Sequence, residues 1–100
     1  MDIKINTVHF DADKKLLDFT EKRVEKLEQF FDGIIAAEVF LNFDKSGEKK
    51  TENKEAKIRL EIPKNDLFAE KKGKAFEEAV DGAVRALEKQ LKKHKERIRQ

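Results

Sequence analysis

The sequence predicts one α+β domain in the order β-α-β-β-β-α, with two helices packed on one face of a four-stranded mixed sheet. Two observations lead to this fold class. Apolar residues recur at every second position in four segments, as in half-buried strands, and at every third or fourth position in two longer segments, as in amphipathic helices. Strands that alternate so regularly need cover on one face only, so both helices are expected there. A length of 100 residues corresponds to a single domain, residues 1–100.

The first strand and the first helix are expected before Gly33. Ile3 and Ile5 alternate with polar residues, which predicts a strand. Either Asp11 or Asp13 can cap the helix that follows, and Gly33 is its predicted end. The expected inward positions of this helix are Leu17, Thr20, Val24, Leu27 and Phe31. A right-handed crossover through the helix would make the first two strands parallel.

Three further strands are predicted in the middle of the chain, and we expect them to pair antiparallel. The first, residues 34–43, has an inward face of Ile35, Ala37, Val39, Leu41 and Phe43. After a polar loop, residues 54–62 form the next strand, with an inward face of Ala56, Ile58, Leu60 and Ile62. A tight connection at Pro63 to Asn65 leads to a short last strand, residues 66–72, in which Leu67 and Ala69 point inward. The segment 71–74 then breaks the pattern.

The second helix is predicted from Ala75 nearly to the end of the chain. Its apolar residues fall within a narrow arc: Phe76, Val80, Val84, Leu87, Leu91 and Ile98. Because this stripe reaches Ile98, the whole helix is expected to pack on the core.

The residues that enzymes and metal sites need are missing or badly placed. The chain has no cysteine, its four glycines form no phosphate-binding loop, and its carboxylates recur on a helix surface. His94 borders the apolar stripe, and His9 has no second ligand at a recognisable spacing. We therefore expect no enzymatic activity, metal, cofactor or small-molecule substrate. No apolar run approaches the roughly 20 residues that span a bilayer, and no signal peptide is recognisable, so we expect a cytoplasmic protein without a membrane partner.

Basic residues concentrate at the C-terminal end of the chain. Residues 87–100 carry a net charge of +4, whereas the whole chain carries +2. Cations near a helix C-terminus interact favourably with the negative end of the helix dipole. This interaction accounts only for Arg97 and Arg99 in the last turn. The remaining basic positions of this helix are Arg85, Lys89, Lys92, Lys93 and Lys95. Their density indicates either a solvated face or an anionic partner, of which nucleic-acid phosphate is the commonest, and charge alone leaves both open.

The first helix is neutral in sum, but its charges divide between two flanks. At about 100° per residue, one flank carries Lys15, Phe19, Lys22, Arg23, Lys26 and Phe30, and the other carries Asp18, Glu21, Glu25 and Glu28. The outer face of the sheet offers Phe40 and little else for base stacking. A basic surface on helices fits better, as in double-stranded-RNA-binding domains, whose helix-strand-strand-strand-helix order this chain contains.

Four segments together resemble the ribosome hibernation-promoting factors, also called ribosome-associated inhibitors or sigma modulation proteins. The segments are KLEQFFD (26–32), LFAE (67–70), AVDGAV (79–84) and QLKKHKERI (90–98). The likeness covers essentially the whole chain and keeps the order of the motifs. The chain is similar to the short form, which lacks the C-terminal dimerisation domain of long members, so one ribosome-binding domain is expected.

The resemblance implies a translation inhibitor that binds small-subunit rRNA in the mRNA and tRNA channel and promotes hibernation of idle ribosomes. The implied partner is the small ribosomal subunit and its rRNA, and the isolated protein is expected to be a monomer. Carried over by position, the RNA-binding residues are Lys22, Lys26, Lys89, Lys93, His94, Lys95 and Arg97. The charge pattern adds Arg23, Arg85 and Lys92.

Three features depart from the family pattern. Ala86 stands where many relatives have lysine, the lysines at 71, 72 and 74 occupy a connection that is typically acidic, and the loop 44–53 is longer than usual. The sigma modulation name also leaves a second function open. In that alternative, the chain is a protein-interaction module whose split-charge first helix engages a sigma factor or another acidic protein.

Overall fold

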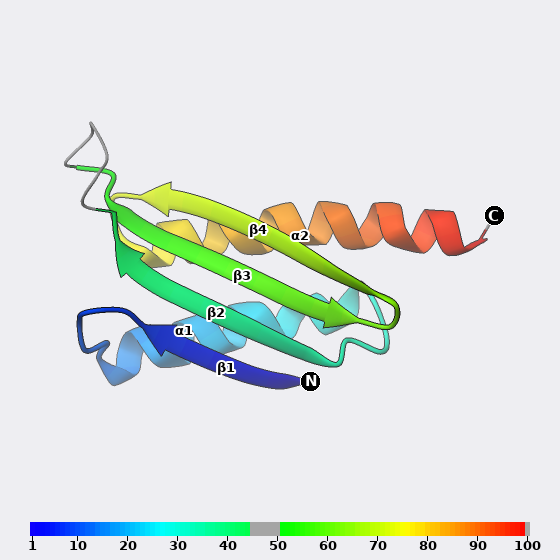
Figure 1. Cartoon of the computed structure of the whole chain (residues 1–100), viewed down its shortest axis with the longest axis horizontal. Helices are drawn as coiled ribbons and strands as arrows, with labels where there is room; N and C mark the ends of the chain where they lie inside the picture. The colour runs from blue at the N-terminus through cyan, green and yellow to red at the C-terminus, as the bar shows by residue number, and fades with distance from the viewer. Residues whose placement is uncertain (45–50, 100) are drawn as a thin grey trace.

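A computed structural model describes residues 1–44 and 51–99 of the chain. Its elements follow the predicted order (Figure 1). They are β1 (Asp2–Thr7), α1 (Lys14–Glu25), the 3-10 turn η1 (Lys26–Gln29), β2 (Ala36–Phe43), β3 (Lys54–Ile62), β4 (Asn65–Gly73) and α2 (Phe76–Arg99). The predicted long loop falls mainly on residues outside these ranges. Within the described ranges, no helix is long and apolar enough to cross a membrane.

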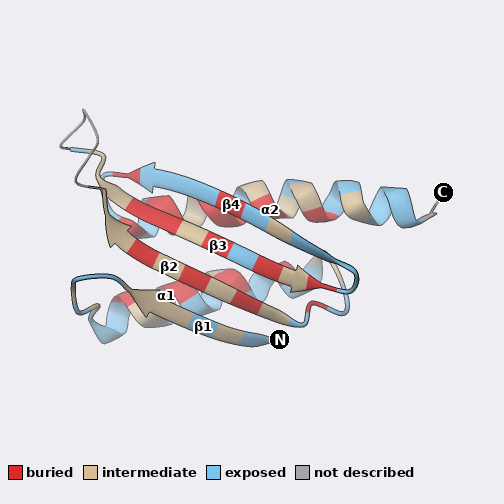
Figure 2. Ribbon diagram, viewed as in Figure 1, coloured by how far each residue is buried: buried red, intermediate tan, exposed pale blue. Residues whose placement is uncertain are grey.

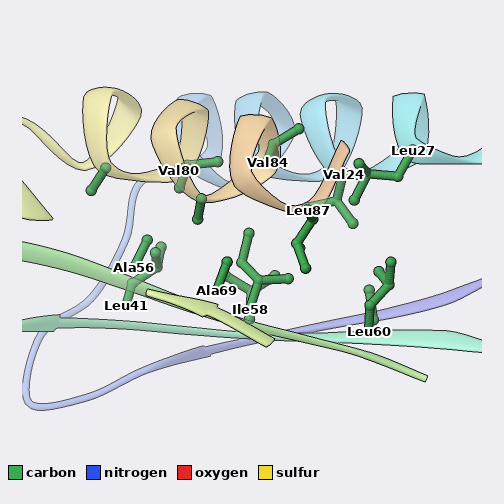
Figure 3. Close-up of a cluster of buried hydrophobic side chains, with 14 of the residues drawn as sticks. Val24, Leu27, Leu41, Ala56, Ile58, Leu60, Ala69, Val80, Val84 and Leu87 are labelled. Carbon is green, nitrogen blue, oxygen red and sulfur yellow. The ribbon is translucent and has the colours of Figure 1, made fainter. Parts of the chain in front are cut away.

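The four strands form one sheet in the order β1-β2-β3-β4. β1 pairs parallel with β2, and the other two pairs are antiparallel. Val39 occupies the middle of this arrangement, opposite Ile5 on one side and Ile58 on the other. Both helices cover the same face of the sheet, as Figures 1 and 3 show, and the opposite face is left open. The predicted mixed sheet with two helices on one face is therefore confirmed.

The hydrophobic core lies between the sheet and the two helices (Figures 2 and 3). β3 supplies the four inward residues that its alternation predicts, Ala56, Ile58, Leu60 and Ile62, and all are buried. The helices cover them with Val24, Leu27, Val80, Val84, Leu87 and Leu91, among others. Three phenylalanine rings form a cluster beside the core. Phe10 stacks on Phe76 at 4.8 Å between centroids, and Phe43 meets both rings edge-on.

The first helix begins where predicted and ends earlier than predicted. The Asp13 carboxylate caps it by accepting a hydrogen bond from the Leu16 amide at 2.8 Å. This start turns Leu16 into the core and leaves Leu17 only partly buried. The α-helix stops at Glu25 and tightens into η1, and Gly33 lies in the following turn with φ of 96°, so the prediction that the helix reaches Gly33 was wrong.

Two strand predictions also need correction. Ile34, not Ile35, is buried before β2, because the strand begins only at Ala36 and the preceding turn reverses the alternation. β4 spans Asn65–Gly73, one residue more at each end than the predicted strand 66–72, and the strand is not broken at Lys71 and Lys72 as the segment 71–74 suggested. The aliphatic stem of Lys71 lies close to Gly82 of α2, where the helix has no side chain, so a lysine is accommodated on the covered face.

α2 leaves the core after Leu91. Leu91 is fully buried, whereas Ile98 is 63% exposed, so the prediction that Ile98 packs on the core was wrong. Figures 1 and 2 show the last turns of α2 running past the covering helix and the sheet into an exposed end. Just before this end, a hydrogen bond attaches α2 to the sheet: Nε2 of Gln90 donates to the backbone carbonyl of Phe68 in β4 at 2.9 Å. We call residues 92–99 the C-terminal arm.

Candidate nucleic-acid interface

One carboxylate joins the two helices through two arginines. Nη1 of Arg23 in α1 donates to Oδ1 of Asp81 in α2 at 2.7 Å. Nη2 of Arg85, one turn further along α2, lies 2.9 Å from Oδ2 of the same carboxylate. Each carboxylate oxygen therefore holds one guanidinium, and two of the predicted RNA-binding residues lie together across the helix pair.

Aromatic side chains of α1 and of the turn after η1 contact basic residues. The Arg23 guanidinium lies over the Phe19 ring, 4.9 Å from its centroid, and the Lys92 ammonium lies 5.2 Å from the Phe30 centroid. His94 meets Phe31 edge-on at 5.4 Å between ring centroids. We call this line of contacts the interhelical seam. It comprises Phe19, Arg23, Phe30, Phe31, Asp81, Arg85, Lys92 and His94.

Lys22 and Lys26 lie outside the seam. Both are exposed and line a shallow open groove together with Met1, Glu25, Glu28 and Gln29. The amino group of Met1 closes one side of this groove by pairing with the Glu28 carboxylate at 3.0 Å. The two lysines therefore have acidic neighbours, and they extend the basic surface across the outside of the first helix.

The C-terminal arm concentrates the remaining predicted cations. Lys89 precedes it, and Lys93, Lys95 and Arg97 are exposed within it. Residues 92–99 contain five basic residues and one acidic residue, which gives a net charge of +4 on about 12 Å of helix. Lys92 and His94 still contact Phe30 and Phe31, whereas Lys93, Lys95 and Arg97 are exposed on the part of the helix that follows the last core residue, Leu91.

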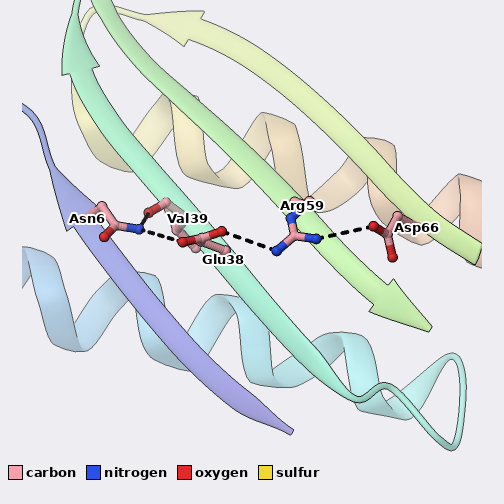
Figure 4. Close-up of polar contacts among 5 residues, drawn as sticks. All are labelled: Asn6, Glu38, Val39, Arg59 and Asp66. Atoms are coloured by element: carbon pink, nitrogen blue, oxygen red, sulfur yellow. Dashed lines mark hydrogen bonds and ion pairs between the residues drawn. The ribbon is translucent and has the colours of Figure 1, made fainter. Parts of the chain in front are cut away.

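The open face of the sheet has a different electrostatic character. Arg59 donates to Glu38 at 3.3 Å and to Asp66 at 3.2 Å, and Asn6 extends this chain by donating to Glu38 at 3.3 Å and to the Val39 carbonyl (Figure 4). The hydrogen bonds to the two carboxylates raise the pKa of the Arg59 guanidinium, so its charge is fixed and already paired.

Two lysines of the open face are paired in the same way. Lys57 lies 3.6 Å from Glu55, and Lys72 is bonded to Asp44, a contact that raises the pKa of the Lys72 ammonium. The three cations of β3 and β4 on this face, Lys57, Arg59 and Lys72, thus all have carboxylate partners. The described part of this face also carries Phe68, half exposed, and the exposed Lys4 of β1.

The structure joins some predicted site residues and separates others. Arg23, Arg85, Lys92 and His94 share the seam, while Lys22, Lys26, Lys93, Lys95 and Arg97 lie on exposed surfaces around it. Sequence reasoning did not identify Asp81, although its spacing of four residues from Arg85 was a usable signal. In the part of the chain that the structure describes, no group of three or more histidine and carboxylate side chains is placed to hold a metal ion.

Comparisons with known proteins agree on one family. The family described as Sigma 54 modulation protein / S30EA ribosomal protein matches residues 3–99. The ribosome hibernation promoting factor of Escherichia coli K12 is 30% identical over 100 residues, covering 100% of this chain and 99% of that protein. The ribosome hibernation promotion factor of Bacillus subtilis is 31% identical over 98% of this chain, which spans only half of that relative's length.

Solved structures show the same fold. The N-terminal domain of Thermus thermophilus Protein Y superposes with a TM-score of 0.78 at 27% identity, covering 94% of this chain and 99% of that one. A ribosomal subunit interface protein from Coxiella burnetii gives a TM-score of 0.82 at 22% identity, over 95% and 98% of the two chains. Since the sequence match and the fold cover nearly every residue, the chain belongs to the family of Sigma 54 modulation protein / S30EA ribosomal proteins.

Proposed function

We propose that this chain binds the small ribosomal subunit through its two helices, contacts rRNA in the channel used by mRNA and tRNA, and promotes hibernation of idle ribosomes. The names of the relatives supply the first support, since the Escherichia coli and Bacillus subtilis proteins are named for ribosome hibernation. No enzymatic step is part of this proposal. Binding and blocking are sufficient for it.

The observation that carries the proposal is the unequal pairing of cations on the two faces. On the open face, the cations of β3 and β4 are held by carboxylates. On the helix face, no ion pair among the described residues involves Lys22, Lys26 or the basic residues from Lys89 to Arg97. Cations without carboxylate partners can exchange their counterions for phosphates, which is the main source of affinity for nucleic acid.

Side-chain chemistry favours RNA shape over base sequence as the feature recognised. The exposed lysines act as point charges that meet phosphate oxygens from many directions. The aromatic rings of the seam are already covered by Arg23, Lys92 and His94, so they are not free for base stacking. A helical arm with Lys93, Lys95 and Arg97 exposed suits the phosphates that line a folded RNA channel.

The experiment compares two quadruple alanine variants that lose the same charge. One replaces Lys22, Lys26, Lys89 and Lys93, which the proposal assigns to RNA binding. The matched control replaces four exposed lysines that it does not assign: Lys4, Lys14 in the first turn of α1, Lys64 and Lys74. Cosedimentation with purified small subunits is measured over a range of salt concentrations. If all four helix lysines contact phosphate, the slope of log affinity against log salt should fall by about 3 in the first variant and by less than about 1 in the control.

Two results would contradict the proposal. The helix-face variant would bind as tightly as the parent if the RNA contacts lie elsewhere, and equal losses in both variants would indicate non-specific charge attraction. A translation assay with purified components supplies the functional readout, in which the parent should inhibit and the helix-face variant should not. Capture of a purified sigma factor by a parent chain that fails to bind subunits would favour the protein-interaction alternative.

A further inference from the structure

We infer that Asp81 is a positioning residue for RNA binding: it holds Arg23 and Arg85 as a fixed pair of phosphate donors across the two helices. This inference rests on the proposed function and assigns a role to an acidic residue within the basic surface. Arg23 and Asp81 are 58 positions apart in sequence, so the contact fixes α1 against α2 as well as orienting the side chains.

The contact geometry leaves both guanidiniums able to bind a second anion. Each arginine directs one terminal nitrogen at Asp81, through Nη1 for Arg23 and Nη2 for Arg85. A guanidinium carries five N–H donors in a planar fork, so most of its donors remain available after one such contact. The Arg85 side chain is 73% exposed and the Arg23 side chain 39%, whereas Asp81 is only 23% exposed. The carboxylate thus lies deeper, and the cations lie toward solvent.

Arg23 is restrained from two directions. Its guanidinium is bonded to Asp81 and also lies over the Phe19 ring at 4.9 Å. A long side chain that is ordered before binding loses less conformational freedom when it meets a phosphate. Arg85 gains the same advantage from its contact with the second oxygen of Asp81. The two arginines therefore present donors at a fixed spacing, which a flexible lysine pair would not.

Two physical effects of Asp81 on RNA affinity have opposite signs. If the carboxylate only neutralises nearby cations, removing its charge should strengthen RNA binding, because the net charge of the chain rises from +2 to +3. If it positions the arginines, removing the charge should weaken binding even though the surface becomes more positive. The sign of the change therefore separates the two roles.

The test compares Asp81→Asn with Glu96→Gln, a matched loss of one negative charge at an exposed position of the same helix. Binding to purified small subunits is measured by competition against the parent, and calorimetry locates a temperature at which each variant is folded. We expect Asp81→Asn to bind about 5- to 10-fold more weakly than the parent, from the ordering of two long side chains. Glu96→Gln should bind at least as tightly as the parent.

A second variant keeps the inference testable if Asp81→Asn is poorly folded. Arg85→Lys preserves the charge but not the fork, and it should weaken binding about threefold in the parent. At a temperature where Asp81→Asn is folded, Arg85→Lys should cause no further loss in that background. The inference is overturned if Asp81→Asn binds as tightly as Glu96→Gln, or if Arg85→Lys binds like the parent. Failure of the parent itself to bind subunits would instead refute the proposed function.

Discussion

Replacing Leu91 with alanine should lower the free energy of unfolding by about 3 kcal/mol, whereas replacing Ile98 should change it by less than about 0.5 kcal/mol. The two residues occupy the same stripe of α2, seven positions apart. Leu91 is fully buried, so its truncation leaves a cavity, and such substitutions cost about 2 to 5 kcal/mol. Little over a third of Ile98 is covered, and alanine is the better helix former by about 0.4 kcal/mol, which offsets the small burial that is lost.

Urea unfolding followed by far-ultraviolet circular dichroism measures both changes. The m-value should stay constant, because neither substitution alters the surface that unfolding exposes. For a chain of this size, about 3 kcal/mol corresponds to a fall of roughly 12 to 24 °C in Tm. A loss above about 1 kcal/mol for Ile98→Ala would refute the conclusion that the core ends at Leu91, as would a loss below about 1 kcal/mol for Leu91→Ala.

Two further changes test backbone strain and a buried carboxyl. Lys64 follows Pro63 in the β3–β4 turn with φ of 66°, a region where glycine is unstrained, so Lys64→Gly should stabilise the chain by about 0.5 to 1 kcal/mol. Lys64→Ala, the control for lost charge, should bring no such gain in a urea titration, and an equal gain would disprove the strain argument. Burial, reinforced by a hydrogen bond to Glu70 and opposed by Lys57, raises the pKa of Glu55 above its ordinary value of 4.5. The folded state thus holds this proton more tightly than the unfolded state, and the stability from it is lost as the pH rises through the raised pKa. Relative to Glu55→Gln, the parent should therefore gain stability as the pH falls from neutrality toward the ordinary carboxyl pKa of 4.5, and parallel Tm curves for the two proteins would contradict this sign.

The sequence was most informative where local pattern and tertiary burial agree. The alternation in β3 identifies its four buried residues because a central strand has one covered face along its whole length. The turn before β2 interrupts that logic, so Ile34 and Ile35 exchange roles. In α1 the exact start at Asp13 sets the phase of the helix, so Leu16 is buried where the sequence predicted Leu17.

The end of the core could not be predicted from helical periodicity. A nine-residue strand spans about 30 Å, whereas the 24 residues of α2 span about 36 Å, so the helix is longer than the sheet it covers. Ile98 continues the stripe in sequence, yet the sheet no longer lies beneath it. Periodicity reports which side of a helix is apolar but not whether a neighbour is present.

The sequence predicted which basic residues form the candidate interface, but not which carboxylates pair with them. Basic residues on two helices indicate a charged surface, and the structure assigns several of them to one seam. The contact between Arg23 and Asp81 depends on how α1 and α2 pack, which no local pattern encodes. The pairing of Arg59 on the open face is likewise a property of three adjacent strands.

The bond from Gln90 to the Phe68 carbonyl has a consequence for association between copies of the chain. β4 is an edge strand, and the free polar groups of an edge are a template on which another strand can add. Gln90 occupies one of its carbonyl groups, and Lys71 and Lys72 place charge along the same strand. A neighbouring molecule that added a strand here would have to displace the amide and bury both lysines beside its own backbone. This edge is thereby protected against strand-mediated aggregation while the arm beyond it stays open.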